Sequence, residues 1–273
     1  MRYIRSAPST LDYGNSKKEK SMAGLSDIVK FANTYLNIDQ FDDYCPNGLQ
    51  VEGGHNVTKI LTAVTASQAV LDGAVEQGVD MVMVHHGYFW RGEAEPITGL
   101  KYKKIRTLID NNISLLAYHL PLDAHPECGN NAQLAKLLGV KVRSCFGPGK
   151  IQLVVSGELA EPIPVYLFVE QVRRVTGREP LHIGADKNKL VRTVGICTGG
   201  AQNYFSSAID YGVDIYVTGE VSEQNFHMAI ESGVDFISAG HHATERYGVQ
   251  ALGDVLCNKF SIQANYFEIS NPI

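Results

Sequence analysis

Residues 57–86 read VTKILTAVTASQAVLDGAVEQGVDMVMVHH, and residues 191–220 read VRTVGICTGGAQNYFSSAIDYGVDIYVTGE. Each stretch predicts an apolar strand, a turn of small residues, an amphipathic helix, the tripeptide Gly-Val-Asp and a second apolar strand. The tripeptides at 78–80 and 212–214 are 134 residues apart. Any two βαβ units look broadly alike, but the shared tripeptide and the equal helix lengths favour an internal duplication.

The likeness continues beyond these stretches. Residues 103–119 and 224–241 each predict a further helix and strand. Successive βαβ units require right-handed crossovers and mostly parallel strands. The runs MVMV, SLLAY, DIYV and DFISA are almost wholly apolar or β-branched, which is typical of strands covered on both faces. The sequence therefore predicts an α/β protein with two duplicated repeats and mostly parallel sheets.

The repeats divide the chain. Residues 1–21 lack the apolar core of a signal peptide. They are mostly polar, so we expect a tail here and the folded part to begin near Met22 or Ala23. The segment 141–190 contains a strand candidate (Ile151–Val155) and a helix candidate (Val165–Thr176). We expect four segments: a polar, disordered tail (1–21), a first α/β repeat (22–140), a connecting strand–helix segment (141–190) and a second α/β repeat (191–273).

Composition excludes several classes. The net charge of the 273 residues is −5, and the 24 Lys and Arg form no dense stripe, so a nucleic-acid groove is not expected. No apolar run approaches the roughly 20 residues of a membrane span. The 5 cysteines are widely spaced and form no CxxC pair, which argues against a disulfide scaffold or a zinc ribbon. A reducing, cytoplasmic location is the expectation.

Imidazoles and carboxylates follow the predicted buried strands. In open α/β sheets, ligands bind at the carboxyl ends of the strands, because loops and helix N-termini converge there. The polar residues at these ends are His85 and His86 after MVMV, His119 and Asp123 after SLLAY, Glu220 after DIYV, and His241 and Glu245 after DFISA.

The spacing of these residues favours a metal site. His241 and Glu245 are four apart and would share one helix face. His85 and His86 are adjacent and would serve one ion each. Singly, a His pair is usually a surface feature and Asp123 a cap or turn residue. Together these five residues predict two divalent ions, bridged by a carboxylate or water, with water activated for attack at phosphorus or carbonyl carbon.

Other residues have weaker signals. His119 could orient a ligand or could be a hydrogen-bonded core residue. Glu220 occupies the repeat position of His86 and is a candidate base. Thr198-Gly199-Gly200 lacks the lysine of a P-loop, so a tight turn is favoured over an anion site. Asn130 resembles a helix-start residue, and the loop with Trp90 could line a substrate cleft.

Seven segments together carry a resemblance to a known family. The sequence resembles the GTP cyclohydrolase 1 type 2 homologues, the Nif three-like or YbgI/YqfO group, in their short bacterial form. The matching segments are Tyr44–Gly53, Val64–Gln68, His85–Glu93, His119–Gln133, Cys197–Gly200, Thr218–Gln224 and Gly240–Arg246.

The resemblance implies two intertwined α/β repeats with mixed sheets and a dinuclear metal site. It implies homohexameric rings, trimers of dimers, whose sites face an internal cavity. The family name suggests water attack on a purine carbon, but this chain lacks the Cys/His zinc arrangement of ordinary GTP cyclohydrolase I, so GTP is only one candidate substrate. The ligands carried over from the family motif are His85, His86, Asp123, His241 and Glu245.

Two functions fit the sequence. The first is a cytosolic dinuclear-metal hydrolase acting on a nucleotide-like or other small phosphorylated or cyclic substrate, with Glu220 as a proton shuttle. Without thiolate ligands, Zn, Fe, Mn and Ni are all suitable. The second is a non-catalytic metal-binding regulatory or scaffold protein, which the residues do not distinguish from the first. A metallophosphoesterase or amidohydrolase barrel is disfavoured, because its motifs are absent and eight βα units do not fit.

Overall fold

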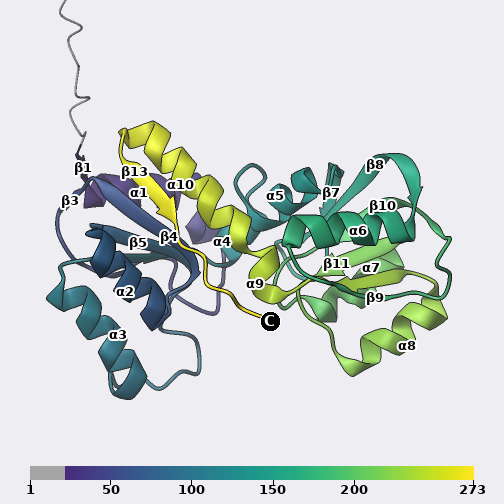
Figure 1. Cartoon of the computed structure of the whole chain (residues 1–273), viewed down its shortest axis with the longest axis horizontal. Coiled ribbons are helices and arrows are strands. Elements are labelled where there is room, and N and C mark those ends of the chain that lie inside the picture. Colours follow the sequence, from purple (N-terminus) through teal and green to yellow (C-terminus); the bar gives the residue numbers. More distant parts are fainter. Residues whose placement is uncertain (1–21) are drawn as a thin grey trace, which may run out of the picture.

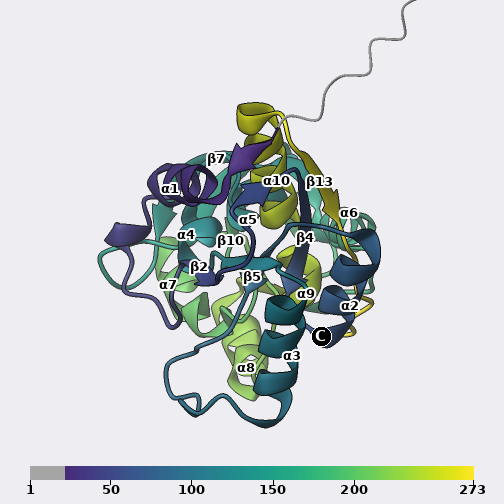
Figure 2. The ribbon, with the colours of Figure 1, turned by 90° about the vertical axis from the view of Figure 1, so that its left-hand side faces the viewer.

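Two sheets lie side by side, and each has helices on both faces (Figures 1 and 2). The computed structural model describes residues 22–273, so the predicted tail at 1–21 lies outside the described residues. The first element, β1 (Ala23–Gly24), pairs with β3 (Asn56–Val57). Between the sheets lie two short helices, α4 (Leu120–Ala124) and α9 (His241–Thr244).

The first sheet has five strands in the order β13-β4-β5-β6-β2. The first four are mutually parallel, whereas β2 pairs antiparallel with β6 at the edge. The strands are β2 (Gly48–Val51), β4 (Lys59–Thr65), β5 (Met81–His86), β6 (Ser114–Ala117) and β13 (Gln263–Tyr266). The covering helices are α1 (Leu25–Tyr35) and α10 (Arg246–Phe260) on one face, and α2 (Gln68–Gln77) and α3 (Gly99–Asp110) on the other.

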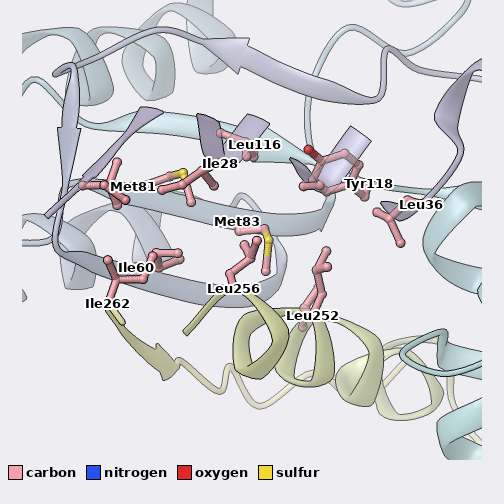
Figure 3. Close-up of a cluster of buried hydrophobic side chains, with 14 of the residues drawn as sticks. Ile28, Leu36, Ile60, Met81, Met83, Leu116, Tyr118, Leu252, Leu256 and Ile262 are labelled. Atoms are coloured by element: carbon pink, nitrogen blue, oxygen red, sulfur yellow. The ribbon is translucent and has the colours of Figure 1, made fainter. Parts of the chain in front are cut away.

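The C-terminal elements complete this first sheet. In Figure 3, Leu252 and Leu256 of α10 lie against Ile60 and Met83 of the sheet. All four side chains are fully buried, so they are removed from water by the packing of segments far apart in the chain. Because α10 and β13 belong to the second repeat (191–273) but pack on the first sheet, the two repeats are intertwined, as the family resemblance implies.

The second sheet has six strands in the order β7-β8-β10-β11-β12-β9. Its centre, β10 to β12, is parallel, and the other three pairings are antiparallel. The strands are β7 (Lys141–Phe146), β8 (Val154–Pro164), β9 (Leu181–Ile183), β10 (Leu190–Ile196), β11 (Ile215–Thr218) and β12 (Asp235–Ser238). The helices are α5 (Asn130–Leu137) and α6 (Val165–Thr176) on one face, and α7 (Phe205–Tyr211) and α8 (Glu223–Ser232) on the other.

The connecting segment is only partly as predicted. The helix Val165–Thr176 is confirmed as α6, but the strand predicted over Ile151–Val155 begins at Val154 and continues to Pro164. The pairing of β8 with β10 changes register between Glu158 and Ile163. Pro162 lies in this irregular stretch, where a missing N–H removes no ladder bond. Pro162 is therefore accommodated by a bulge in the β8–β10 pairing.

The repeated Gly-Val-Asp has a physical cause. Asp80 accepts hydrogen bonds from the N–H and hydroxyl of Thr58 at 2.7 and 2.8 Å, next to the start of β4. Asp214 accepts the equivalent pair from Thr193 in β10, at 2.8 and 2.9 Å. In both halves the aspartate therefore ties one strand to the beginning of the next. The antiparallel edge strands β2 and β9 are likewise equivalent, so the duplicated architecture is confirmed.

Residues 22–273 also contain two 3-10 helices, η1 (Ile38–Gln40) and η2 (Gln202–Tyr204). η2 leads directly into α7. Among residues 22–273, no helix has the length and apolar character needed to cross a membrane.

Candidate metal centre

Five predicted side chains meet between the two sheets. His85 and His86 are the last residues of β5, and Asp123 lies in α4, which follows β6. His241 begins α9 after β12, and Glu245 directly follows α9. The carboxyl ends of strands from both sheets thus face one another, and the site draws on both halves of the chain.

Glu245 stands at the centre of this cluster. Its Oε1 lies 3.4 Å from Nε2 of His85. Its Oε2 lies 3.3 Å from Nε2 of His86 and 3.2 Å from Nε2 of His241. Asp123 Oδ1 lies 3.5 Å from His85 Nε2 on the Oε1 side. The two oxygens of one carboxylate therefore face two different sets of partners.

These contacts define two candidate ligand groups that share Glu245. The first group adds His85 and Asp123, and the second adds His86 and His241. Within each group, one ligand atom per residue lies within 4.8 Å of the others. Three nitrogen and oxygen donors around one point suit a divalent transition metal that retains an open position.

The burial of the cluster fits a cation. His85 is 0% exposed and Glu245 is 2% exposed. His85 Nε2 and Glu245 Oε2 are buried polar atoms that make no hydrogen bond with any residue of 22–273. Leaving such atoms unpaired costs about 1–3 kcal/mol each, more where the group is charged. A metal ion in the first ligand group would give His85 Nε2 a partner, and one in the second would give Glu245 Oε2 a partner, so the residues present fit the ions that the sequence predicts.

Each candidate histidine is held through its other ring nitrogen. His85 Nδ1 lies 2.8 Å from the carbonyl oxygen of Tyr118, and His241 Nδ1 lies 2.7 Å from Glu220 Oε1. His86 Nδ1 lies 3.2 Å from the Thr65 hydroxyl. Partners of this kind fix the ring and direct Nε2 to the metal. The predicted base Glu220 therefore contacts His241 on the side away from Glu245.

Asp123 is also held from outside the cluster. Its Oδ1 accepts hydrogen bonds from Asn130 Nδ2 at 2.9 Å and from the Thr198 hydroxyl at 3.3 Å. Asn130 also accepts a hydrogen bond from the N–H of Gly248 in α10. It begins α5 as predicted, but its orienting role was not expected. No sequence signal indicated it, because its partners are distant in the chain or depend on a side-chain direction.

Charge within the cluster shifts several pKa values. Burial alone would lower the pKa of His85, but Asp123 and Glu245 outweigh it and raise that pKa to about 10. Burial and the neighbouring imidazoles lower the pKa of His86 to about 3. Burial alone would also lower the pKa of His241, but Glu245 raises that pKa to about 9. The imidazoles hold the pKa of Glu245 well below its ordinary value despite burial. Glu245 is thus an anionic carboxylate beside the imidazoles of His85 and His241, whose Nε2 protons a metal ion would replace.

The turn after β10 lies against Glu245. Gly199 has φ +68°, and a Cβ built there would overlap with Glu245 Oε1. Glycine is needed both for the backbone conformation and for this close approach. The N–H groups of Thr198 and Gly199 donate to Asn131 and Thr244 side chains. The predicted tight turn is confirmed, and its purpose is to leave space for the carboxylate.

A cavity of about 310 Å³ opens beside the cluster. Tyr44 and Tyr204 contribute aromatic walls, and Asp123, His241 and Glu245 contribute the polar end. The cavity is also lined by Cys197, which follows β10; burial raises the pKa of its thiol well above the ordinary value. A protonated thiol is a poor metal ligand, so the donors here are nitrogen and oxygen.

The other histidines differ in their surroundings. His242 lies 3.1 Å from Glu268 and is outside both ligand groups, so of the two histidines in the segment Gly240–Arg246 the structure brings His241 into the cluster. His227 is exposed on α8. His119 lies close to the cluster and contacts Asp43. Trp90 packs edge-on against His119, with ring centroids 5.0 Å apart.

One known family matches almost the whole described part of the chain. The model of the Duf34/NIF3 (NGG1p interacting factor 3) family matches residues 23–272. The chain belongs to this family. The predicted resemblance is therefore confirmed for this Duf34/NIF3 chain.

Relatives of this Duf34/NIF3 chain are similar over nearly their full length. A protein of Pseudomonas aeruginosa named GTP cyclohydrolase 1 type 2 homolog is 54% identical over 249 residues, covering 91% of this chain and 98% of the relative. The protein of the same name from Escherichia coli K12 is 48% identical over 247 residues, covering 90% and 98%.

Solved structures agree with the fold. A structure described as protein ybgI, of unknown function, superposes with a TM-score of 0.88 at 47% identity, covering 92% of this chain and 100% of the other. TTHA1606 from Thermus thermophilus superposes with a TM-score of 0.82 at 33% identity, with the same coverage.

Proposed function

We propose that this chain is a metal-dependent hydrolase that holds two divalent ions. The proposal rests on Glu245, whose two carboxylate oxygens face two separate groups of donors. A pair of ions about 3.5–4 Å apart would activate water and stabilise the negative charge that develops at phosphorus or carbonyl carbon. The residues that would hold the ions are His85, His86, Asp123, His241 and Glu245.

The surrounding residues keep these donors in place. The Tyr118 carbonyl and Glu220 occupy Nδ1 of His85 and His241, and Asn130 holds Asp123. Loss of such partners usually lowers metal affinity about 10–100-fold. With only nitrogen and oxygen donors, Zn, Fe, Mn and Ni are all suitable. A proton-shuttle role for Glu220 stays a prediction, and its contact with His241 favours a positioning role.

The substrate would enter the cavity beside the cluster. Its volume of about 310 Å³ is at the small end for ligand pockets, which run from about 300 to 1,000 Å³. Tyr44 and Tyr204 offer faces for a planar ring, while the metal end would bind an oxygen of the substrate. A nucleotide-like or other small phosphorylated or cyclic molecule fits these walls, in keeping with the names of the relatives.

The assembly and location are part of the same proposal. We propose a homohexamer, a trimer of dimers, as the family resemblance implies, in the cytoplasm. The cysteines form no disulfide among residues 22–273, which supports a reducing compartment. Light scattering should give a mass about six times the 29.9 kDa of the chain. A monomeric mass at micromolar concentration would contradict the hexamer.

Metal analysis tests the ligand assignment. His85→Ala and Asp123→Ala should each lower the metal content per chain, because each removes one donor from a group of three. His227→Ala is the control, since that side chain is 64% exposed on α8. If both ligand variants retain the metal content of the parent protein, the assignment is wrong.

A substrate screen separates the enzyme from its alternative. Nucleotides and phosphoesters would be incubated with protein loaded with Mn, Zn or Fe. Turnover that disappears in His85→Ala and Asp123→Ala supports the hydrolase. Tight binding of one of these compounds without turnover supports a metal-dependent regulatory or scaffold protein.

A further inference from the structure

A further histidine has the surroundings of the candidate ligands. His119 directly precedes α4, and its Nδ1 lies 2.7 Å from Oδ1 of Asp43. It is therefore held through Nδ1 by an oxygen, as His85 and His241 are. The sequence left open whether this residue orients a ligand or fills the core.

Asp43 is rigidly placed. Its carboxylate also accepts hydrogen bonds from Asn47 Nδ2 at 2.8 Å and from the N–H groups of Tyr44 and Leu120 at 2.6 and 2.9 Å. The Asp43 side chain is 2% exposed. A buried carboxylate with this many donors cannot rotate freely, so it fixes the orientation of the His119 ring through Nδ1.

The second ring nitrogen of His119, Nε2, has no hydrogen-bond partner in the described part of the chain. Within residues 22–273, Nε2 of His119 makes no hydrogen bond, although the side chain is only 14% exposed. Its ring centroid lies 5.1 Å from that of His85 and 5.8 Å from that of His86. One ring nitrogen from each of these three histidines lies within 4.8 Å of the others. His119 also lines the cavity beside the cluster.

The packing keeps the ring in this position. Trp90 stands edge-on against His119 at 5.0 Å, and the indole N–H donates to the Gly87 carbonyl at 3.2 Å. A core histidine would be expected to have both ring nitrogens satisfied. Among residues 22–273, His119 instead has one ring nitrogen without a hydrogen bond, and its ring lies beside those of His85 and His86.

We propose that His119, held by Asp43, is a sixth protein ligand of the metal centre, beside His85 and His86. The inference rests on the proposed function, because it needs ions at the five-residue cluster. A fourth protein donor on one ion would make the two ions unequal, since the other would keep three donors and an open position.

Cobalt titration tests the proposal without relying on activity. Metal-free parent protein and His119→Gln would be titrated with Co²⁺ and followed by visible absorption and calorimetry. Loss of a nitrogen donor should change the visible spectrum of one Co²⁺ and weaken its binding at least about 10-fold. Asp43→Asn, which leaves the imidazole in place, should weaken the same ion about 10–100-fold.

The chain offers a matched control. His182 Nε2 lies 2.7 Å from the buried Asp235 carboxylate, which makes an equivalent histidine–carboxylate pair outside the candidate ligand groups. His182→Gln should bind Co²⁺ as the parent does. Identical spectra and affinities for the parent, His119→Gln and Asp43→Asn would overturn the proposal. If the parent itself binds no Co²⁺, the proposed function fails first, so the two failures are distinguishable.

Discussion

Glu245 Oε2 lies 3.3 Å from Nε2 of His86, although the two residues come from different halves of the duplicated chain. His86 ends a strand of the first sheet, and Glu245 follows a strand of the second. The candidate metal centre therefore forms only when both sheets are packed together. Any ion bound there would link the two halves and stabilise their association.

Replacement of Glu245 should affect both of the proposed ions. Glu245→Gln removes the charge shared by the two donor groups, so metal content should fall from about two ions per chain to well below one. His241→Ala, which alters only one group, should lose about one ion. Elemental analysis after dialysis measures both. Equal losses in the two variants would show that Glu245 is not shared.

Replacement of Glu220 should weaken metal binding without changing its stoichiometry. Glu220 fixes Nδ1 of His241 at 2.7 Å, so Glu220→Ala should lower metal affinity about 10–100-fold while the number of sites stays the same. Competition with a chelator of known affinity measures the change. Glu223→Ala is the control, because that side chain is 85% exposed. Unchanged affinity in Glu220→Ala would exclude the positioning role.

A substitution at Gly199 tests whether the backbone must approach the Glu245 carboxylate closely. Gly199→Ala should displace Glu245, with which the new Cβ would overlap, and should reduce metal affinity at least about 10-fold. Gly212→Ala isolates the backbone effect, since Gly212 also has positive φ (+84°), but a Cβ built there would have no atom of the described residues within 4 Å. Both variants should lose about 1–2 kcal/mol of unfolding free energy from strain. If Gly199→Ala binds metal with the affinity of the parent protein, the close approach of Gly199 to Glu245 does not matter for metal binding.

We expect the ionised Asp214 carboxylate to make a pH-dependent contribution to the free energy of unfolding. Although burial opposes it, hydrogen bonds from Thr193 and Arg192 lower the pKa of Asp214 below its ordinary value of 3.8. A lowered pKa in the folded state means that the stabilisation is present above about pH 3.8 and is lost as pH falls through the folded pKa. Asp214→Asn should therefore cost about 1 kcal/mol at pH 7 and progressively less below pH 3.8.

Urea unfolding at several pH values measures this difference. Asp210→Asn is the control, because the Asp210 side chain is exposed on α7 and makes no hydrogen bond among the described residues. A cost for Asp214→Asn that stays constant from pH 7 to pH 3 would show that the carboxylate is not titrating as argued.

Local patterns in the sequence predicted most of the elements. The apolar runs at Met81–His86, Ser114–Ala117, Ile215–Thr218 and Asp235–Ser238 are strands, because buried parallel strands need continuous apolar residues. The helix Val165–Thr176 ends at a glycine with positive φ, as helices commonly do. The predicted range of the strand that became β8, Ile151–Val155, was wrong at both ends, because the extent of a strand depends on its pairing with neighbouring strands and not on the local sequence alone.

The sequence by itself determined which residues stand at the ends of the buried strands, because strand period and helix spacing are local properties. Only the tertiary structure decided how they meet: the two faces of Glu245, the hold of Asn130 on Asp123, and the contact of Asp43 with His119. These contacts join residues from different segments, so they depend on how the two sheets pack. Hydrogen bonds and ion pairs require distances near 3 Å, and no pattern along one chain sets a distance between two sheets.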